Sequence, residues 1–168
     1  MKTEFSEKRI FVQPGYIYVL FEPAILYTAL GSGGIIAIFD KIRRFGGMIY
    51  YIHPIAQNAY CATAHYAFPG VVHMVNMFID AGSHVSDLEA HLFGGAENFR
   101  SANYTPEIGA KNIQIGRRIL ELKRVVIISE DTGLNRGRKV AFHSGTGEVL
   151  VAKVDRIRED DWYPQLPN

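Results

Sequence analysis

The chain of 168 residues has the length of one domain and is long enough to bury a hydrophobic core. Hydrophobic residues make up 48% of it and charged residues 21%, a globular composition that excludes a disordered chain. The formal net charge of +1 gives no electrostatic basis for nucleic acid or an anionic membrane as the main partner, and the single cysteine excludes an internal disulfide.

No segment predicts export or insertion into a membrane. Residues 1–4 lead into no apolar stretch typical of a secretory signal. The most hydrophobic segment, residues 16–30, is interrupted by Glu22 and Pro23 and is too short to span a bilayer. We therefore expect a cytoplasmic protein with one domain over residues 1–168, with a core of about residues 12–154 and a peripheral tail of residues 155–168.

The first third of the chain predicts a series of strands. Residues 16–21 and 24–30 are rich in β-branched and aromatic side chains, and residues 35–39 and 48–52 form two further apolar runs. Turn-forming glycine, proline and charged residues separate these runs.

Two helices are predicted in the middle of the chain. After Pro69, apolar residues recur at positions 71, 74, 75 and 78, the spacing of one helical face, and Gly82 is a typical C-terminal stop. Thr105 would cap a second helix that begins at Pro106. The inner face of this helix would carry Ile108, Ile115, Ile119 and Leu122.

The remaining strands favour an α+β sandwich. Residues 88–93 predict a strand, residues 125–128 have the pattern of a central strand, and residues 139–143 and 148–154 predict a hairpin. Because strands and helices do not alternate strictly, a doubly wound sheet is disfavoured.

Six short blocks of sequence carry a family resemblance. They are Leu-Gly-Ser at 30–32, Gly-Gly-Met at 46–48, Leu-Glu-Ala at 88–90 with Phe-Gly-Gly-Ala at 93–96, Ile-Gly-Ala-Lys-Asn at 108–112, Ser-Glu-Asp-Thr-Gly at 129–133 with Asn-Arg-Gly-Arg-Lys at 135–139, and Thr-Gly-Glu-Val-Leu-Val at 146–151. In this order and at these distances, they resemble the CheD family, the bacterial chemoreceptor glutamine deamidases. One block alone would be weak evidence, but six ordered blocks are specific.

The resemblance implies both a fold and a biological role. It implies a two-sheet β-sandwich with two main helices packed on one side, similar to the catalytic domain of cytotoxic necrotizing factor. Members of the family deamidate particular glutamines of chemoreceptors, some also demethylate receptor glutamates, and they bind a CheC-type phosphatase. No cofactor is implied.

The residues that carry the family's chemistry are altered in this chain. The family uses a cysteine nucleophile after Leu-Gly-Ser, a histidine two residues after Gly-Gly-Met, and a threonine that precedes the cysteine. By this resemblance the three positions are Gly33, Tyr50 and a retained Thr28. Glycine has no nucleophile, and a phenol with a pKa of about 10 is a poor general base near neutral pH. Because losing the nucleophile of a catalytic set costs about 10⁶-fold in turnover, we expect an inactive deamidase.

The resemblance also suggests which residues surround the former substrate cleft. Phe68 stands where the family has an aspartate, and Leu134 where it has a second glycine. Arg136 and Arg138 are expected to shape the approach to the final hairpin. The other residues expected at the cleft are Gly31, Ser32, Gly34, Gly47 and Met48.

A displaced nucleophile is the alternative catalytic hypothesis. Cys61, His53 and His65 lie close in sequence and could form a dyad or bind a metal. Because isolated cysteines usually behave as small hydrophobic residues, we predict no metal site there. Residues 31–34 are rich in glycine but lack the lysine and the following helix of a phosphate-binding loop.

Three functional hypotheses remain. The first is a non-catalytic CheD-like protein that binds a chemoreceptor segment or a CheC-type phosphatase through the cleft. The second is an active glutamine amidohydrolase with a displaced nucleophile such as Cys61, and the third is a repurposed interaction protein outside chemotaxis. Loss of the thiol favours the first and third over the second.

Overall fold

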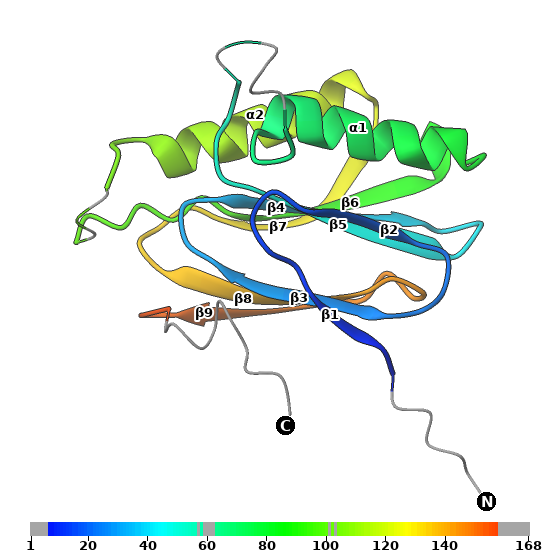
Figure 1. Ribbon diagram of the computed structural model, residues 1–168, viewed down its shortest axis with the longest axis horizontal. Coiled ribbons are helices and arrows are strands. Elements are labelled where there is room, and N and C mark those ends of the chain that lie inside the picture. The colour runs from blue at the N-terminus through cyan, green and yellow to red at the C-terminus, as the bar shows by residue number, and fades with distance from the viewer. Residues whose placement is uncertain (1–6, 57, 59–62, 101, 103, 158–168) are drawn as a thin grey trace, which may run out of the picture.

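The computed structural model describes residues 7–56, 58, 63–100, 102 and 104–157. These residues form nine strands and two α-helices. The strands make two stacked sheets, and both helices lie on the outer face of one sheet (Figure 1). The predicted α+β sandwich with two main helices on one side is therefore confirmed.

The four-stranded sheet has the order β1-β3-β8-β9. Its strands are β1 (Arg9–Phe11), β3 (Ile25–Leu30), β8 (Gly137–His143) and β9 (Val149–Val154). Strand β1 runs parallel to β3, and the other neighbours are antiparallel. The predicted hairpin is confirmed as β8 and β9, whereas the short strand β1 was not predicted.

The five-stranded sheet has the order β2-β5-β4-β6-β7. Its strands are β2 (Ile17–Leu20), β5 (Phe45–Tyr51), β4 (Gly34–Asp40), β6 (Leu88–Gly94) and β7 (Val126–Thr132). The prediction of a central strand at residues 125–128 is wrong, because β7 is an edge strand that pairs in parallel with β6. Val126 and Ile128 are 55% and 50% exposed, so the continuous apolar run does not mark burial on both faces.

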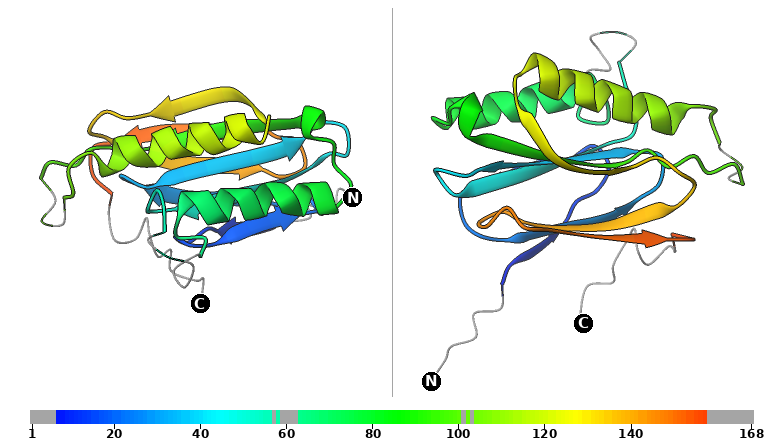
Figure 2. Two further views of the ribbon diagram at one scale, coloured as in Figure 1. Left: turned by 90° about the horizontal axis from the view of Figure 1, so that it is seen from above. Right: turned by 180° about the vertical axis from the view of Figure 1, so that it is seen from behind.

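The helices are α1 (Ala67–Asp80) and α2 (Ile108–Leu122), which lie side by side over the five-stranded sheet (Figure 2). The predicted apolar face of α1 is buried, and the helix stops before Gly82, whose φ of +96° is accessible to glycine. A short 3₁₀ segment, Val85–Asp87, leads into β6. Within the described residues, no helix is long and apolar enough to cross a membrane.

Helix α2 begins two residues later than predicted. It starts after Glu107, which has a left-handed φ of 64°, and no side chain caps it, so Thr105 and Pro106 lie outside the helix. Its inner face also differs, because Leu122 is 58% exposed. Small residues let the backbone of α2 approach the sheet, and hydrophobic periodicity does not mark such residues. The buried residues are Gly109, Asn112, Ile113, Gly116, Ile119 and Leu120.

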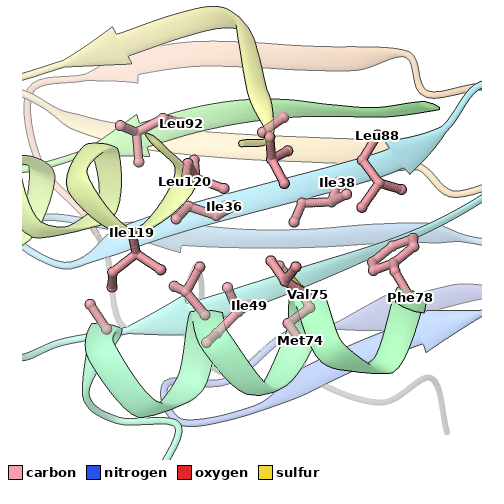
Figure 3. Close-up of a cluster of buried hydrophobic side chains, with 14 of the residues drawn as sticks. Ile36, Ile38, Ile49, Met74, Val75, Phe78, Leu88, Leu92, Ile119 and Leu120 are labelled. Atoms are coloured by element: carbon pink, nitrogen blue, oxygen red, sulfur yellow. The ribbon is translucent and has the colours of Figure 1, made fainter. Parts of the chain in front are cut away.

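Two apolar layers hold the fold together. The helix-side core fills the space between the helices and the five-stranded sheet (Figure 3), and the inter-sheet core fills the space between the two sheets. Alternate residues of β4 and β5 enter opposite layers, because successive side chains of a strand point to opposite faces. Both strands are therefore buried along their whole length.

Candidate functional site

A pocket of about 660 Å³ opens at one end of the sandwich. It lies where β4 begins and β5 ends, on the left in Figure 1. Five segments supply its walls: residues 31–33, residues 50 and 52, part of the connection between β6 and α2 together with residue 108 at the start of α2, residues 135 and 137, and residues 155–157. The pocket is therefore built from parts of the chain that are far apart in sequence.

Gly33 and Tyr50 meet at the floor of this pocket. A Cβ atom at Gly33 would lie 2.9 Å from Cε2 of Tyr50 and 2.8 Å from the carbonyl oxygen of Tyr51. The Tyr50 side chain is only 1% exposed and packs in the inter-sheet core. Its ring therefore occupies space that a side chain at position 33 would need.

Tyr51 points to the other side of the sheet, into the helix-side core. Its ring lies against Gly34 and its hydroxyl oxygen against Gly116, so a Cβ atom at either glycine would overlap the Tyr51 side chain. Its hydroxyl donates to the carbonyl oxygen of Asn112 at 2.8 Å. Burial raises the pKa of Tyr51 well above its ordinary value, and the nearby charge of Arg117 opposes this only in part.

Asn112 fixes the pocket floor to helix α2. Its side chain is fully buried, and Nδ2 donates to the carbonyl oxygens of Ser32 at 2.9 Å and Ile52 at 3.0 Å. One amide group thus joins the segment before β4, the segment after β5 and α2. Because buried polar groups are costly unless they are paired, this arrangement makes the floor rigid.

Arg138 holds the opposite wall. It is fully buried, and its guanidinium donates to the carbonyl oxygens of Gly133 at 2.6 Å and Arg136 at 2.9 Å and pairs with Asp131 at 3.1 Å. The expected structural role of this arginine near the final hairpin is confirmed. Leu134 in the same loop has a left-handed φ of 60°, a conformation that glycine adopts more easily.

The sequence comparisons identify the family to which this scaffold belongs. Residues 53–153 match a family model described as CheD chemotactic sensory transduction. The chain belongs to the CheD family. Thr28, Gly33 and Tyr50 precede the residues matched by this model. The alignments with individual relatives are longer and cover about 90% of the chain, which includes these three positions.

Three similar proteins illustrate these alignments. A probable chemoreceptor glutamine deamidase CheD of Sulfurimonas denitrificans is 30% identical over 155 residues, which covers 91% of this chain and 97% of the relative. Probable chemoreceptor glutamine deamidase CheD 2 of Geobacter sulfurreducens is 27% identical, covering 90% and 93%. A probable chemoreceptor glutamine deamidase CheD of Methanosarcina barkeri is 33% identical, covering 76% and 84%.

The residues predicted from the CheD resemblance fall into two groups. Four of them line the pocket: Gly31, Ser32, Gly33 and Tyr50. Thr28 is not part of the pocket lining. It is buried on β3, on the side that faces the inter-sheet core, and its Oγ1 has no hydrogen-bond partner among the described residues. The assignment of these positions to a former catalytic site stays a prediction.

The remaining predicted cleft residues lie outside the pocket lining. Gly34 is covered by the Tyr51 ring, and Gly47 packs against Tyr18 and Val19 of β2. Met48 is buried in the inter-sheet core. Phe68 lies in the first turn of α1 and is 49% exposed. A strand places alternate side chains on opposite faces, so residues adjacent in a motif need not share a cleft.

The described residues contain no cysteine–histidine dyad that would support the displaced-nucleophile hypothesis. Cys61 lies outside the described residues. The N–H of His53 donates to the carbonyl oxygen of His65 at 2.9 Å, while the His65 ring packs against Gly15. Neither histidine lines the pocket. Within the part of the chain that is described, no group of three histidine, cysteine, aspartate or glutamate side chains could hold a metal ion.

Sequence reasoning missed most of the polar pocket wall. Asn98, Arg100 and Tyr104 belong to the connection between β6 and α2, where no motif marked them. Arg156 belongs to the segment predicted as a peripheral tail, yet it lines the pocket. Residues 158–168 of that tail lie outside the described residues. The sequence block at 108–112 came closest to marking this wall. It begins with the pocket residue Ile108 and ends with Asn112, which holds the pocket floor.

Proposed function

We propose that this CheD-family protein binds a cytoplasmic chemoreceptor segment in the pocket and does not hydrolyse its glutamine side chains. Its relatives are named as probable chemoreceptor glutamine deamidases, which supports a receptor as the partner. A CheC-type phosphatase is the other partner that the family resemblance implies. We expect either interaction to take place in the cytoplasm.

The contact between Gly33 and Tyr50 carries the proposal. Covalent amide hydrolysis needs a nucleophile, a base that activates it and donors for the oxyanion. With Tyr50 in place, a side chain at position 33 would meet the phenol ring at 2.9 Å and a backbone oxygen at 2.8 Å. Positions 33 and 50 are therefore coupled by packing, and the described pocket lining contains no thiol or imidazole.

The surviving architecture supports a binding role. The pocket volume of about 660 Å³ lies within the range of ordinary ligand sites. Asn112 and Arg138 still hold its floor and wall with hydrogen bonds between buried groups. Because a buried polar group that loses its partner destabilises the fold, these hydrogen bonds keep the pocket walls in place, and a preformed pocket favours binding.

The first test is enzymatic. The purified protein, incubated with receptor fragments, should release no ammonia above the uncatalysed rate, and Cys61→Ser should change nothing. Ammonia release that disappears in Cys61→Ser would instead support the displaced nucleophile. Release that depends on Thr28 and not on Cys61 would also contradict the proposal.

The second test concerns binding. A pull-down from the native cytoplasm, read by mass spectrometry, should retain chemoreceptors or a CheC-type protein. Gly31 lines the pocket and a Cβ atom there would meet nothing within 4 Å, so we expect a large side chain at this position to take up space that a ligand would need. Gly31→Phe should therefore abolish retention, and the matched control Gly31→Ala should preserve it. Retention unaffected by Gly31→Phe would show that the partner binds elsewhere.

A further inference from the structure

The charges of the pocket wall are not balanced among the described residues. Arg100 and Arg156 both line the pocket and are solvent-exposed. They approach it from different parts of the chain, the connection between β6 and α2 and the segment after β9. Neither guanidinium makes an ion pair or hydrogen bond with another described residue. Two positively charged groups are therefore available to a ligand.

Two carboxylates stand near these arginines, and they do not balance both positive charges. Asp155, the acidic residue among the described lining residues, pairs with Arg136 at 2.9 Å. Glu97 lies beside the wall; its Oε1 accepts the N–H of Ala110 at 3.1 Å, near the start of α2, and its Oε2 has no hydrogen-bond partner among the described residues. Its single negative charge offsets one of the two arginines and leaves the other. A ligand with a negative charge would complete this arrangement, because guanidinium groups bind carboxylates through short, charge-assisted hydrogen bonds.

Two exposed apolar side chains stand next to the charged wall. Phe99 is 68% exposed, precedes Arg100 and packs its ring 5.1 Å from the ring of Tyr104. Leu134 is 65% exposed, and its carbonyl oxygen accepts the N–H of Glu97 at 2.8 Å, which joins the two loops. Exposed aromatic and aliphatic groups around a polar pocket fit a peptide with apolar residues beside an acidic one.

We propose that the pocket selects a glutamate carboxylate over a glutamine amide, so that the protein recognises chemoreceptor segments in their deamidated form. This inference rests on the proposed function. Deamidation converts a neutral amide side chain into a carboxylate with one negative charge, which is the group that Arg100 and Arg156 would bind. The protein would then bind the product of glutamine deamidation, the reaction that the names of its relatives state.

The test compares two forms of one receptor. The cytoplasmic fragment of the receptor that the pull-down retains is prepared in two forms. One has glutamine and the other glutamate at the positions that an active family member deamidates. Affinities are measured by calorimetry at low and at moderate salt. We expect the glutamate form to bind about five- to tenfold more tightly at low salt, and the preference to shrink as salt screens the exposed arginines.

Matched variants test whether Arg100 and Arg156 cause the preference for glutamate. Arg100→Gln combined with Arg156→Gln should remove the preference for glutamate, and circular dichroism should show that the fold is retained. Arg118→Gln changes an exposed arginine of α2 that pairs with Glu121 and does not line the pocket, so the preference should survive. N-acetylglutamate amide, which lacks the apolar neighbours, should bind far more weakly than the fragment.

The other outcomes distinguish failure of this inference from failure of the proposed function. Equal affinity for the two forms, or tighter binding of the glutamine form, would overturn the inference and leave the proposed function standing. Binding of neither form would contradict the proposed function itself. A preference that persists in the double arginine variant would also overturn the inference, because the selectivity would then have another source.

Discussion

The helix-side core around Tyr51 and the pocket floor around Tyr50 use neighbouring residues of one strand in different ways. Tyr51 lies between two glycines and donates its hydroxyl to Asn112, so its ring is enclosed on every side. Tyr50 is equally buried, but its ring also borders an open pocket at Gly33. In the first region a missing side chain makes room for packing. In the second, the aromatic ring fills the space that a side chain at position 33 would need.

The largest loss of stability is expected from a substitution beside the enclosed Tyr51 ring. Gly34→Ala would place a Cβ atom within the ring of Tyr51, which cannot move without losing its bond to Asn112. We expect a loss of about 3 kcal/mol in the free energy of unfolding, measured by denaturant titration. Gly31→Ala is the control and should change this value by less than about 0.5 kcal/mol. Equal effects of the two substitutions would contradict the packing described for Tyr51.

A double-mutant cycle tests the pocket floor. Gly33→Cys alone should cost about 2 kcal/mol, because the new side chain meets the Tyr50 ring and the Tyr51 carbonyl oxygen. Tyr50→His alone should also destabilise the buried core, but the double variant should lose about 1 kcal/mol less than the sum of the two single losses, since the smaller ring frees one of the two contacts. Strict additivity would show that the two positions are independent.

The same double variant addresses catalysis. It should not reach the ammonia release of an active family member, because the Tyr51 carbonyl oxygen remains 2.8 Å from the Cβ position of residue 33. Covalent chemistry requires placement within about half an ångström. Binding of the receptor fragment should persist, since it depends on many contacts. Full turnover would mean that the scaffold had remained poised for catalysis.

Removing the Tyr51 hydroxyl should have a smaller effect. Tyr51→Phe leaves the buried Asn112 carbonyl oxygen without this donor and should cost about 1–2 kcal/mol at neutral pH. Burial raises the pKa of Tyr51, so the folded protein keeps the phenol neutral while the unfolded chain ionises it above about pH 10. The stability that the hydroxyl contributes is therefore present below about pH 10 and is lost as the pH rises.

The measurement is the free energy of unfolding of both proteins at several pH values. The difference between wild type and variant should shrink by up to about 1.4 kcal/mol per pH unit above about pH 10. A difference that is constant with pH would contradict the raised pKa of Tyr51.

The smallest effect is expected at the pocket rim and has the opposite sign. Leu134 has a left-handed φ of 60° and is 65% exposed, so little packing would be lost by Leu134→Gly. Relief of the backbone conformation, less the greater entropy of glycine in the unfolded chain, should stabilise the protein by about 0.5–1 kcal/mol. A decrease in the melting temperature would show that the leucine side chain stabilises the loop.

The sequence alone predicted the elements whose pattern is local. Alternation and apolar runs located β2 to β6 and the final hairpin, and helical spacing identified the buried face of α1. Six ordered motifs identified the CheD family before any geometry was known. These predictions succeeded because strand and helix periods depend on neighbouring residues, whose side chains divide between core and solvent in a fixed order.

Only the tertiary structure decided how distant segments meet. The edge position of β7, the glycine-lined face of α2 and the contribution of Arg156 to the pocket all depend on which parts of the chain approach each other. The contact between Gly33 and Tyr50 is also of this kind, because it depends on the pairing of β4 with β5. A glycine in the sequence shows that a side chain is missing, but only its neighbours in space determine what fills that position.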